Sequence, residues 1–184
     1  MVNPVRNTAQ KKADIIVSNG VKNIRLFFLF FLLLSIQNYA LAVQPLRIQN
    51  NVETIAVDLK LLDSENNPVS LSDFKDKPVI LFFWTTWCPY CRKELKALAD
   101  KYENFKKDGL ELLPINVGES ASKVERFIRS YQLPFRVLLD EDTVVADSYN
   151  ILGVPTYIYI NKRGLIVSKG HYFSQGDYQK LISQ

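Results

Sequence analysis

The chain has 184 residues, of which 23 are basic and 19 acidic, and its formal net charge is +4. Residues 1–42 hold five of the basic residues and one of the acidic ones, so residues 43–184 carry 18 of each. Because the excess positive charge belongs to the first part of the chain, it gives no support to nucleic-acid binding, and no nucleic-acid partner is expected.

A secretory signal pattern lies near the start of the chain. Lys22 and Arg25 precede an apolar run at residues 26–36, and a small-x-small sequence follows at residues 40–42. The run is shorter than the roughly 20 apolar residues that a membrane-spanning helix needs. The pattern therefore favours a cleaved signal peptide, with a retained membrane anchor over residues 26–42 as the alternative.

The chain is thus expected to divide into a signal peptide or N-terminal membrane anchor, residues 1–42, and one folded domain, residues 43–184. Export would place that domain in the periplasm or another extracytoplasmic compartment, secreted or anchored to the inner membrane, where disulfides persist. The chain has only two cysteines, Cys88 and Cys91. An exported domain with one close pair and no disulfide framework is expected to use that pair chemically.

Strand and helix patterns alternate along the folded domain, with a turn cluster at residues 64–69. The expected strands cover residues 55–62, 77–84, 110–117, 135–140, 155–161 and 165–170. The expected helices cover residues 89–108, 122–131, 144–149 and 174–183, with a short helical turn at residues 70–74. Strands that alternate with helices and end in a hairpin predict an α/β sandwich with a mixed sheet.

The cysteine pair stands between a buried strand and an amphipathic helix. Residues 77–84 form a continuous apolar run, which is typical of a strand buried on both faces. Pro89 marks a helix start, because a missing N–H does no harm at the first helical position. Open α/β sheets place their sites at this junction.

Two cysteines separated by two residues at a helix start suit thiol–disulfide exchange. The sulfur of Cys88 would face unpaired backbone N–H groups and the positive end of the helix dipole, which favour the reactive thiolate. Cys91, one turn further on, could then attack a mixed disulfide on Cys88. A structural zinc site usually has four Cys or His ligands, and this chain offers two cysteines and His171 alone, so neither a metal nor a cofactor is expected.

Two further residues have both a functional and an ordinary interpretation. Glu94 lies on the same side of the helix as Cys91, with no basic neighbour at helical spacing. If half-buried it would have a raised pKa and could exchange protons with Cys91; otherwise it is a solvated side chain. Pro155 opens a strand; the peptide bond before it is of the kind that can be cis, and the alternative is an ordinary proline at a strand edge.

These features together resemble the thioredoxin superfamily, and more closely its TlpA/ResA-type thiol–disulfide oxidoreductases. The resemblance covers about residues 52–183 and is carried mainly by residues 68–94 and 153–164. It implies a thioredoxin-like sandwich, with a mixed central sheet, helices on both faces and an N-terminal strand extension.

The resemblance also implies roles for individual residues. Cys88 would be the attacking cysteine and Cys91 the resolving one, with Glu94 the acidic residue that tunes the pair. Pro155 would be a cis-proline facing the cysteines, and Val154 would offer its backbone to the substrate as an added strand.

Other positions near the motif refine this expectation. Trp87, Pro89 and Tyr90 would complete the substrate-binding surface. Cytoplasmic thioredoxins have a buried Asp where this chain has Phe82, so Glu94 would have to transfer protons alone. Peroxiredoxins need a proline where this chain has Leu81, which argues against peroxidase activity.

The expected function is that of an extracytoplasmic oxidoreductase that reduces protein disulfides, with apocytochrome c the substrate that the resemblance favours. A membrane thiol electron donor would then re-reduce it. The first alternative is an oxidant or isomerase that donates or rearranges disulfides. The second is a thioredoxin-fold binding module without turnover.

Overall fold

The strands and helices follow one another along residues 54–183, the part that the computed structural model describes. The predicted signal or anchor lies outside these residues. The strands are β1 (Thr54–Ile55), β2 (Lys60–Asp63), β3 (Pro68–Ser70), β4 (Val79–Trp84), β5 (Glu111–Val117), β6 (Leu138–Asp140), β7 (Thr156–Ile160) and β8 (Leu165–Gly170). The helices are the 3-10 helix η1 (Leu71–Phe74), α2 (Pro89–Lys107), α3 (Ala121–Tyr131), α4 (Val144–Ser148) and α5 (Gln175–Ile182).

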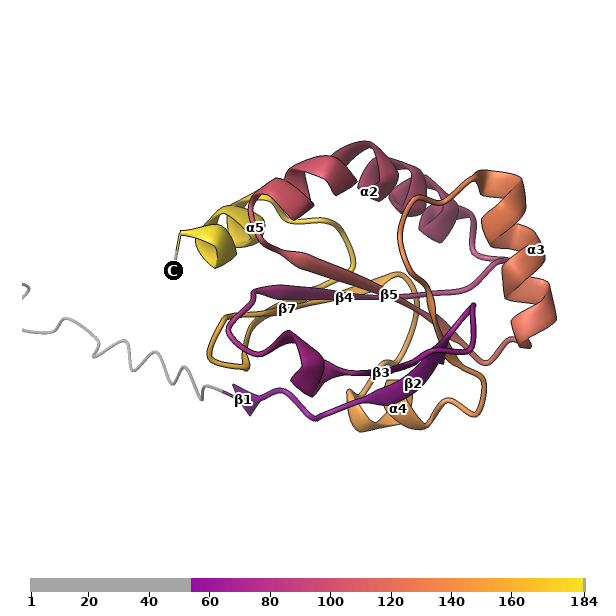
Figure 1. Cartoon of the computed structure of the whole chain (residues 1–184), viewed down its shortest axis with the longest axis horizontal. Helices are drawn as coiled ribbons and strands as arrows, with labels where there is room; N and C mark the ends of the chain where they lie inside the picture. The colour runs from indigo at the N-terminus through magenta and orange to yellow at the C-terminus, as the bar shows by residue number, and fades with distance from the viewer. Residues whose placement is uncertain (1–53, 184) are drawn as a thin grey trace, which may run out of the picture. The chain divides into compact units, whose positions relative to one another are not determined.

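The eight described strands form one mixed sheet in the order β1-β8-β7-β4-β5-β6-β2-β3. β4 pairs in parallel with β5, and β5 with β6, whereas β7 runs antiparallel to β4. In Figure 1, α2 and α5 lie above the sheet and α4 lies below it. The predicted mixed sheet with helices on both faces is confirmed.

Strand β4 separates two hydrophobic cores, because its side chains are buried on both faces. Phe82 and Trp84 pack in the core that holds α2, α3 and α5, and Cys91 belongs to the same core. Leu81 and Phe83 pack on the other face, where α4 and η1 lie. The helix that carries the cysteines is therefore fixed against the most buried strand of the sheet.

The single strand predicted at residues 55–62 is wrong, because this segment pairs at two separate places in the sheet. β1 pairs with β8, whereas β2 pairs with β6 and β3 on the other side. One continuous strand could not pair in both places. Residues 68–70, predicted as part of the turn and the start of the helical turn, instead form the edge strand β3, where the missing N–H of Pro68 does no harm.

Candidate functional site

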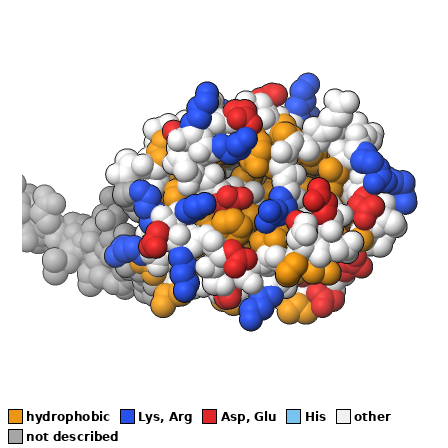
Figure 2. All heavy atoms as spheres, viewed as in Figure 1, with side chains coloured by type: hydrophobic (Ala, Val, Ile, Leu, Met, Phe, Trp, Pro, Cys, Tyr) orange, Lys and Arg blue, Asp and Glu red, His pale blue; other side chains and the backbone are white. Residues whose placement is uncertain are grey.

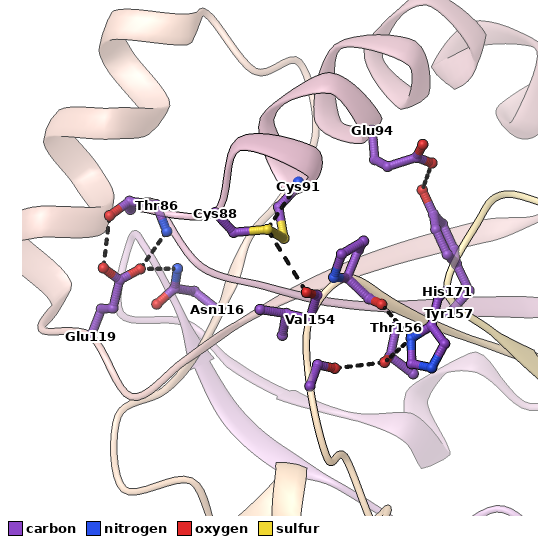
Figure 3. The surroundings of a disulfide bond; sticks show 12 residues. Thr86, Cys88, Cys91, Glu94, Asn116, Glu119, Val154, Thr156, Tyr157 and His171 are labelled. Carbon is purple, nitrogen blue, oxygen red and sulfur yellow. Dashed lines mark hydrogen bonds between the residues drawn. A yellow bond between two sulfur atoms is a disulfide. The ribbon is translucent and has the colours of Figure 1, made fainter.

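A disulfide between Cys88 and Cys91 lies at the start of α2 (Figure 3). Cys88 is the N-cap of the helix, and Pro89 is its first residue, as predicted. The backbone N–H of Cys91 donates a hydrogen bond to Cys88 Sγ at 3.1 Å. Cys88 is 4% exposed and Cys91 is 0% exposed, so an incoming partner meets Cys88 first.

A loop that ends in a cis-proline faces the disulfide from the opposite side. The Val154–Pro155 peptide bond is cis, the isomer that the resemblance implied. Cys88 Sγ lies 3.9 Å from the carbonyl oxygen of Val154. Because Val154 is only half-buried, its peptide group borders both the sulfur and the surface.

His171, for which the sequence predicted no functional role, holds this loop through its imidazole ring. Its Nδ1 lies 2.9 Å from the carbonyl oxygen of Pro155 and 3.3 Å from Thr156 Oγ1. The hydroxyl of Thr156 in turn donates to the carbonyl of Gly153 at 2.7 Å. The chain's one histidine therefore connects the end of β8 to the residues that face the sulfur.

Glu119 holds the segment that precedes Cys88, and sequence reasoning missed it. Its carboxylate accepts hydrogen bonds from Thr86 N at 2.6 Å, Thr86 Oγ1 at 2.7 Å and Asn116 Nδ2 at 2.9 Å. Lys123 Nζ lies 2.6 Å from the same carboxylate. The residue is buried, and Figure 3 shows it beneath the loop that leads to Cys88.

The electrostatics of Glu119 follow from these partners. Burial acts to raise the pKa of its carboxyl, but the hydrogen bonds from Lys123, Asn116 and Thr86 outweigh burial and leave the pKa lowered. Glu119 is therefore a stable anion, fixed 33 residues along the chain from the loop that it supports. The signal in the sequence was a polar Asn116 at the end of an apolar strand, too weak to identify a partner.

Glu94 is half-buried and accepts a hydrogen bond at Oε2 from the hydroxyl of Tyr157 at 2.5 Å. In Figure 3 its carboxylate points toward Tyr157 on β7. Burial first, and then the bond to Glu94, raise the pKa of the Tyr157 phenol far above its ordinary value. The Tyr157 ring lies 4.6 Å from that of Phe82. Phe82 is the residue that, by the resemblance, stands where cytoplasmic thioredoxins have a buried Asp.

Apolar side chains stand in solvent around the disulfide. Trp87 is 65% exposed and Tyr90 67%, so neither is a core aromatic, and Pro89 is exposed between the cysteines. Leu152, which the sequence did not single out, is 97% exposed in the loop before the cis-proline. Trp87, Pro89 and Tyr90, three of the residues predicted to bind substrate, are therefore accessible to a partner.

Among residues 54–183, no group of three or more His, Cys, Asp or Glu side chains could hold a metal ion. No helix in the same range is long and apolar enough to span a bilayer.

A mixed sheet in which a buried strand leads to a C-x-x-C disulfide at a helix start, opposite a cis-proline, defines a thioredoxin-like fold. The match of residues 52–169 to the AhpC/TSA family covers more than half of the chain, which therefore belongs to this family. The predicted kinship with ResA-type proteins is confirmed by the relatives described next.

Curated relatives include two proteins named thiol-disulfide oxidoreductase ResA. The Bacillus subtilis protein is 42% identical over 112 residues, which cover 61% of this chain and 63% of the relative. The Geobacillus kaustophilus protein is 37% identical over 113 residues, which cover 61% of this chain and 65% of the relative. The chain thus spans less than two thirds of the length of either.

Solved structures agree with this assignment. The thioredoxin domain of a thiol-disulfide oxidoreductase from Bacteroides vulgatus is 29% identical, with a TM-score of 0.62, and covers 71% of this chain and 94% of that chain. StoA from Bacillus subtilis is 26% identical, with a TM-score of 0.60, and covers 71% of this chain and 99% of that one. The predicted thioredoxin-like fold is confirmed.

Proposed function

We propose that this chain is a thiol–disulfide oxidoreductase that reduces protein disulfides through Cys88 and Cys91. The observation that carries the proposal is the disulfide at the N-terminus of α2, whose outer sulfur accepts a backbone hydrogen bond beside the Val154 carbonyl. Backbone N–H groups at a helix start stabilise a thiolate, which is the reactive form. The names of the ResA relatives support the same chemistry.

The reduction proceeds in two exchanges that begin from the dithiol. The Cys88 thiolate attacks one sulfur of the substrate disulfide, which forms a mixed disulfide and releases the other substrate sulfur as a thiolate. The Cys91 thiolate then attacks the sulfur of Cys88 and releases the second substrate thiolate. Two electrons pass to the substrate, the released thiolates take up protons, and the protein is left with the Cys88–Cys91 disulfide that the structure contains.

The substrate is an unfolded or extended protein segment. Trp87, Tyr90 and Leu152 offer an exposed apolar rim, and the Val154 peptide can pair with the backbone of an added strand. Apocytochrome c, re-reduction by a membrane thiol donor and an extracytoplasmic location remain part of the proposal. They rest on the TlpA/ResA resemblance and on the signal pattern before residue 43.

Insulin reduction with a thiol donor tests the activity. We expect the domain to reduce insulin, Cys88→Ser to abolish turnover, and Cys91→Ser to accumulate a mixed disulfide on Cys88, because the resolving step is missing. Retained turnover in Cys88→Ser would refute the proposal, and no insulin reduction by the wild-type domain would favour a binding module without turnover. Equal trapping by both variants would contradict the assignment of roles.

The direction of electron flow needs a separate measurement, the reduction potential of the Cys88–Cys91 couple against glutathione or dithiothreitol. A value near or below about −250 mV, in the range of thioredoxin, fits a reductase with a dedicated donor. A value near about −120 mV, typical of strong periplasmic oxidants, would make the protein a disulfide donor instead.

A further inference from the structure

Tyr157 extends from a buried strand to the helix that carries both cysteines. Its side chain is fully buried, and its ring packs 4.6 Å from that of Phe82 and 6.1 Å from that of Phe173. These contacts fix the ring, so its hydroxyl has one position, 2.5 Å from Glu94 Oε2. The bond joins β7 to α2 one helical turn beyond Cys91.

Among the described residues, no Lys or Arg side chain pairs with Glu94. Within residues 54–183 it takes part in no ion pair, although it lies on the same helix face as Cys91. A phenol that donates to a carboxylate makes a short, charge-assisted bond. Because burial and Glu94 raise the pKa of Tyr157, the phenol keeps its proton over the range in which thiols titrate.

We propose that Tyr157 is a positioning residue, whose hydroxyl holds the Glu94 carboxylate turned toward β7 and away from the two cysteines. The inference rests on the proposed function, since it concerns the reactivity of the same dithiol. A carboxylate opposes thiolate formation more strongly as it comes closer to the sulfur. The Tyr157 hydroxyl holds the negative charge of Glu94 farther from the sulfurs and shares it through a hydrogen bond. The thiols are therefore easier to ionise.

Other charged and titratable groups lie near Tyr157 and Glu94. Tyr159 lies two residues further along β7, and Asp177 at the start of α5 acts on Tyr159. On α2, Lys101 lies over the ring of Phe173, at 5.6 Å from its centre. Tyr159 also supplies a matched control, because it is an equally buried phenol whose hydroxyl accepts from Ser174 N at 2.7 Å and makes no bond to Glu94.

The test is the pH midpoint of alkylation of the reduced protein by iodoacetamide. We expect Tyr157→Phe to raise the midpoint by about one pH unit, since a hydrogen bond to a charged group is lost. Tyr159→Phe should leave it unchanged. Glu94→Gln should lower it by removing the charge, and Tyr157→Phe should have no further effect when Glu94→Gln is also present.

A midpoint that does not rise in Tyr157→Phe, or a rise that persists beside Glu94→Gln, would overturn the proposal. Glu94→Asp gives an independent test if Tyr157→Phe does not fold, because the shorter side chain cannot reach the phenol and should raise the midpoint too. An unchanged or lowered midpoint in Glu94→Asp counts against the proposal. Alkylation needs no protein substrate, so this result is separate from insulin reduction, on which the proposed function depends.

Discussion

The two loops that flank Cys88 are held in different ways. The loop before it, around Thr86, is fixed by the buried carboxylate of Glu119 through two hydrogen bonds. The loop opposite, which ends at Pro155, is held by the exposed side chain of His171, whose Nδ1 lies near the Pro155 carbonyl and Thr156 Oγ1, and by the hydroxyl of Thr156.

This difference separates the part of the site that holds the sulfur from the part that meets a partner. Hydrogen bonds to a buried charged group are strong, because the group would otherwise lose its solvation. Hydrogen bonds from an exposed side chain such as His171 compete with water and contribute less. We therefore expect the loop before Cys88 to keep one geometry, and the loop before Pro155 to adjust to the protein that binds.

The largest expected effect comes from breaking the buried support. Glu119→Ala should lower the free energy of unfolding by about 3–5 kcal/mol, because it leaves the polar groups of Thr86 and Asn116 without their acceptor. Urea denaturation measures this. Lys123→Met is the control: its ammonium is half-exposed, so losing the ion pair should cost less than about 1 kcal/mol. Equal losses of unfolding free energy in the two variants would mean that Glu119 stabilises the fold through its ion pair with Lys123 and not through the loop.

The same support should make the protein sensitive to acid. The pKa of Glu119 is lowered on folding, so its contribution is present above the ordinary carboxyl value of 4.5 and is lost as the pH falls through the folded value. The difference in unfolding free energy between wild type and Glu119→Gln should therefore be constant between about pH 6 and 8 and shrink below about pH 4.5. A difference that grows on acidification would contradict the lowered pKa.

A smaller effect is expected when the opposite loop is released. His171→Ala should cost under about 1 kcal/mol of stability, since it removes one hydrogen bond from a side chain that is itself exposed. It should nevertheless raise the KM for a protein disulfide severalfold, because the Val154 peptide is no longer held in place. His171→Asn, which keeps a donor near the Pro155 carbonyl, should recover part of the loss. Turnover of a small disulfide such as oxidised glutathione should stay unchanged; an equal loss there would place the defect at the sulfur.

The smallest effect on stability is expected at Leu152. Leu152→Ser should change the free energy of unfolding by less than about 0.5 kcal/mol, because the side chain is almost fully exposed. It should still weaken insulin reduction if the apolar rim docks the substrate. Val144→Ser, at an exposed aliphatic residue on the helix below the sheet, is the matched control. Equal behaviour of the two variants in the insulin assay would remove Leu152 from the docking surface.

The junction at the cysteines could be predicted from the sequence because its signals are local. The continuous apolar run of β4 and the proline at the start of α2 each specify their element without reference to the rest of the chain. The strand predicted at residues 55–62 failed for the opposite reason. Its apolar pattern is present, but β1 pairs with β8 whereas β2 pairs with β6, near the opposite edge of the sheet. Which strands pair with one another depends on the whole fold.

The supporting residues could not be predicted for a related reason. Glu119 lies in a short loop whose sequence predicts a solvent-exposed side chain, and its partner Thr86 is 33 residues away. Tyr157 lies in an apolar strand where any aromatic residue fits, so nothing local distinguishes a phenol that reaches Glu94. The sequence thus identified the two sulfurs, Glu94 and Pro155, but not Glu119 and Tyr157, which hold the surrounding segments.

The positions of the two ends of the described domain have a practical consequence. β1 pairs with the first residues of β8, whereas the cis-proline and the disulfide lie at the other end of the sheet. Figure 1 shows α5 and the C-terminal end on the same side as β1, remote from the start of α2. An affinity tag, a fluorophore or a link to an electrode at either end would therefore leave the disulfide free to meet its partner.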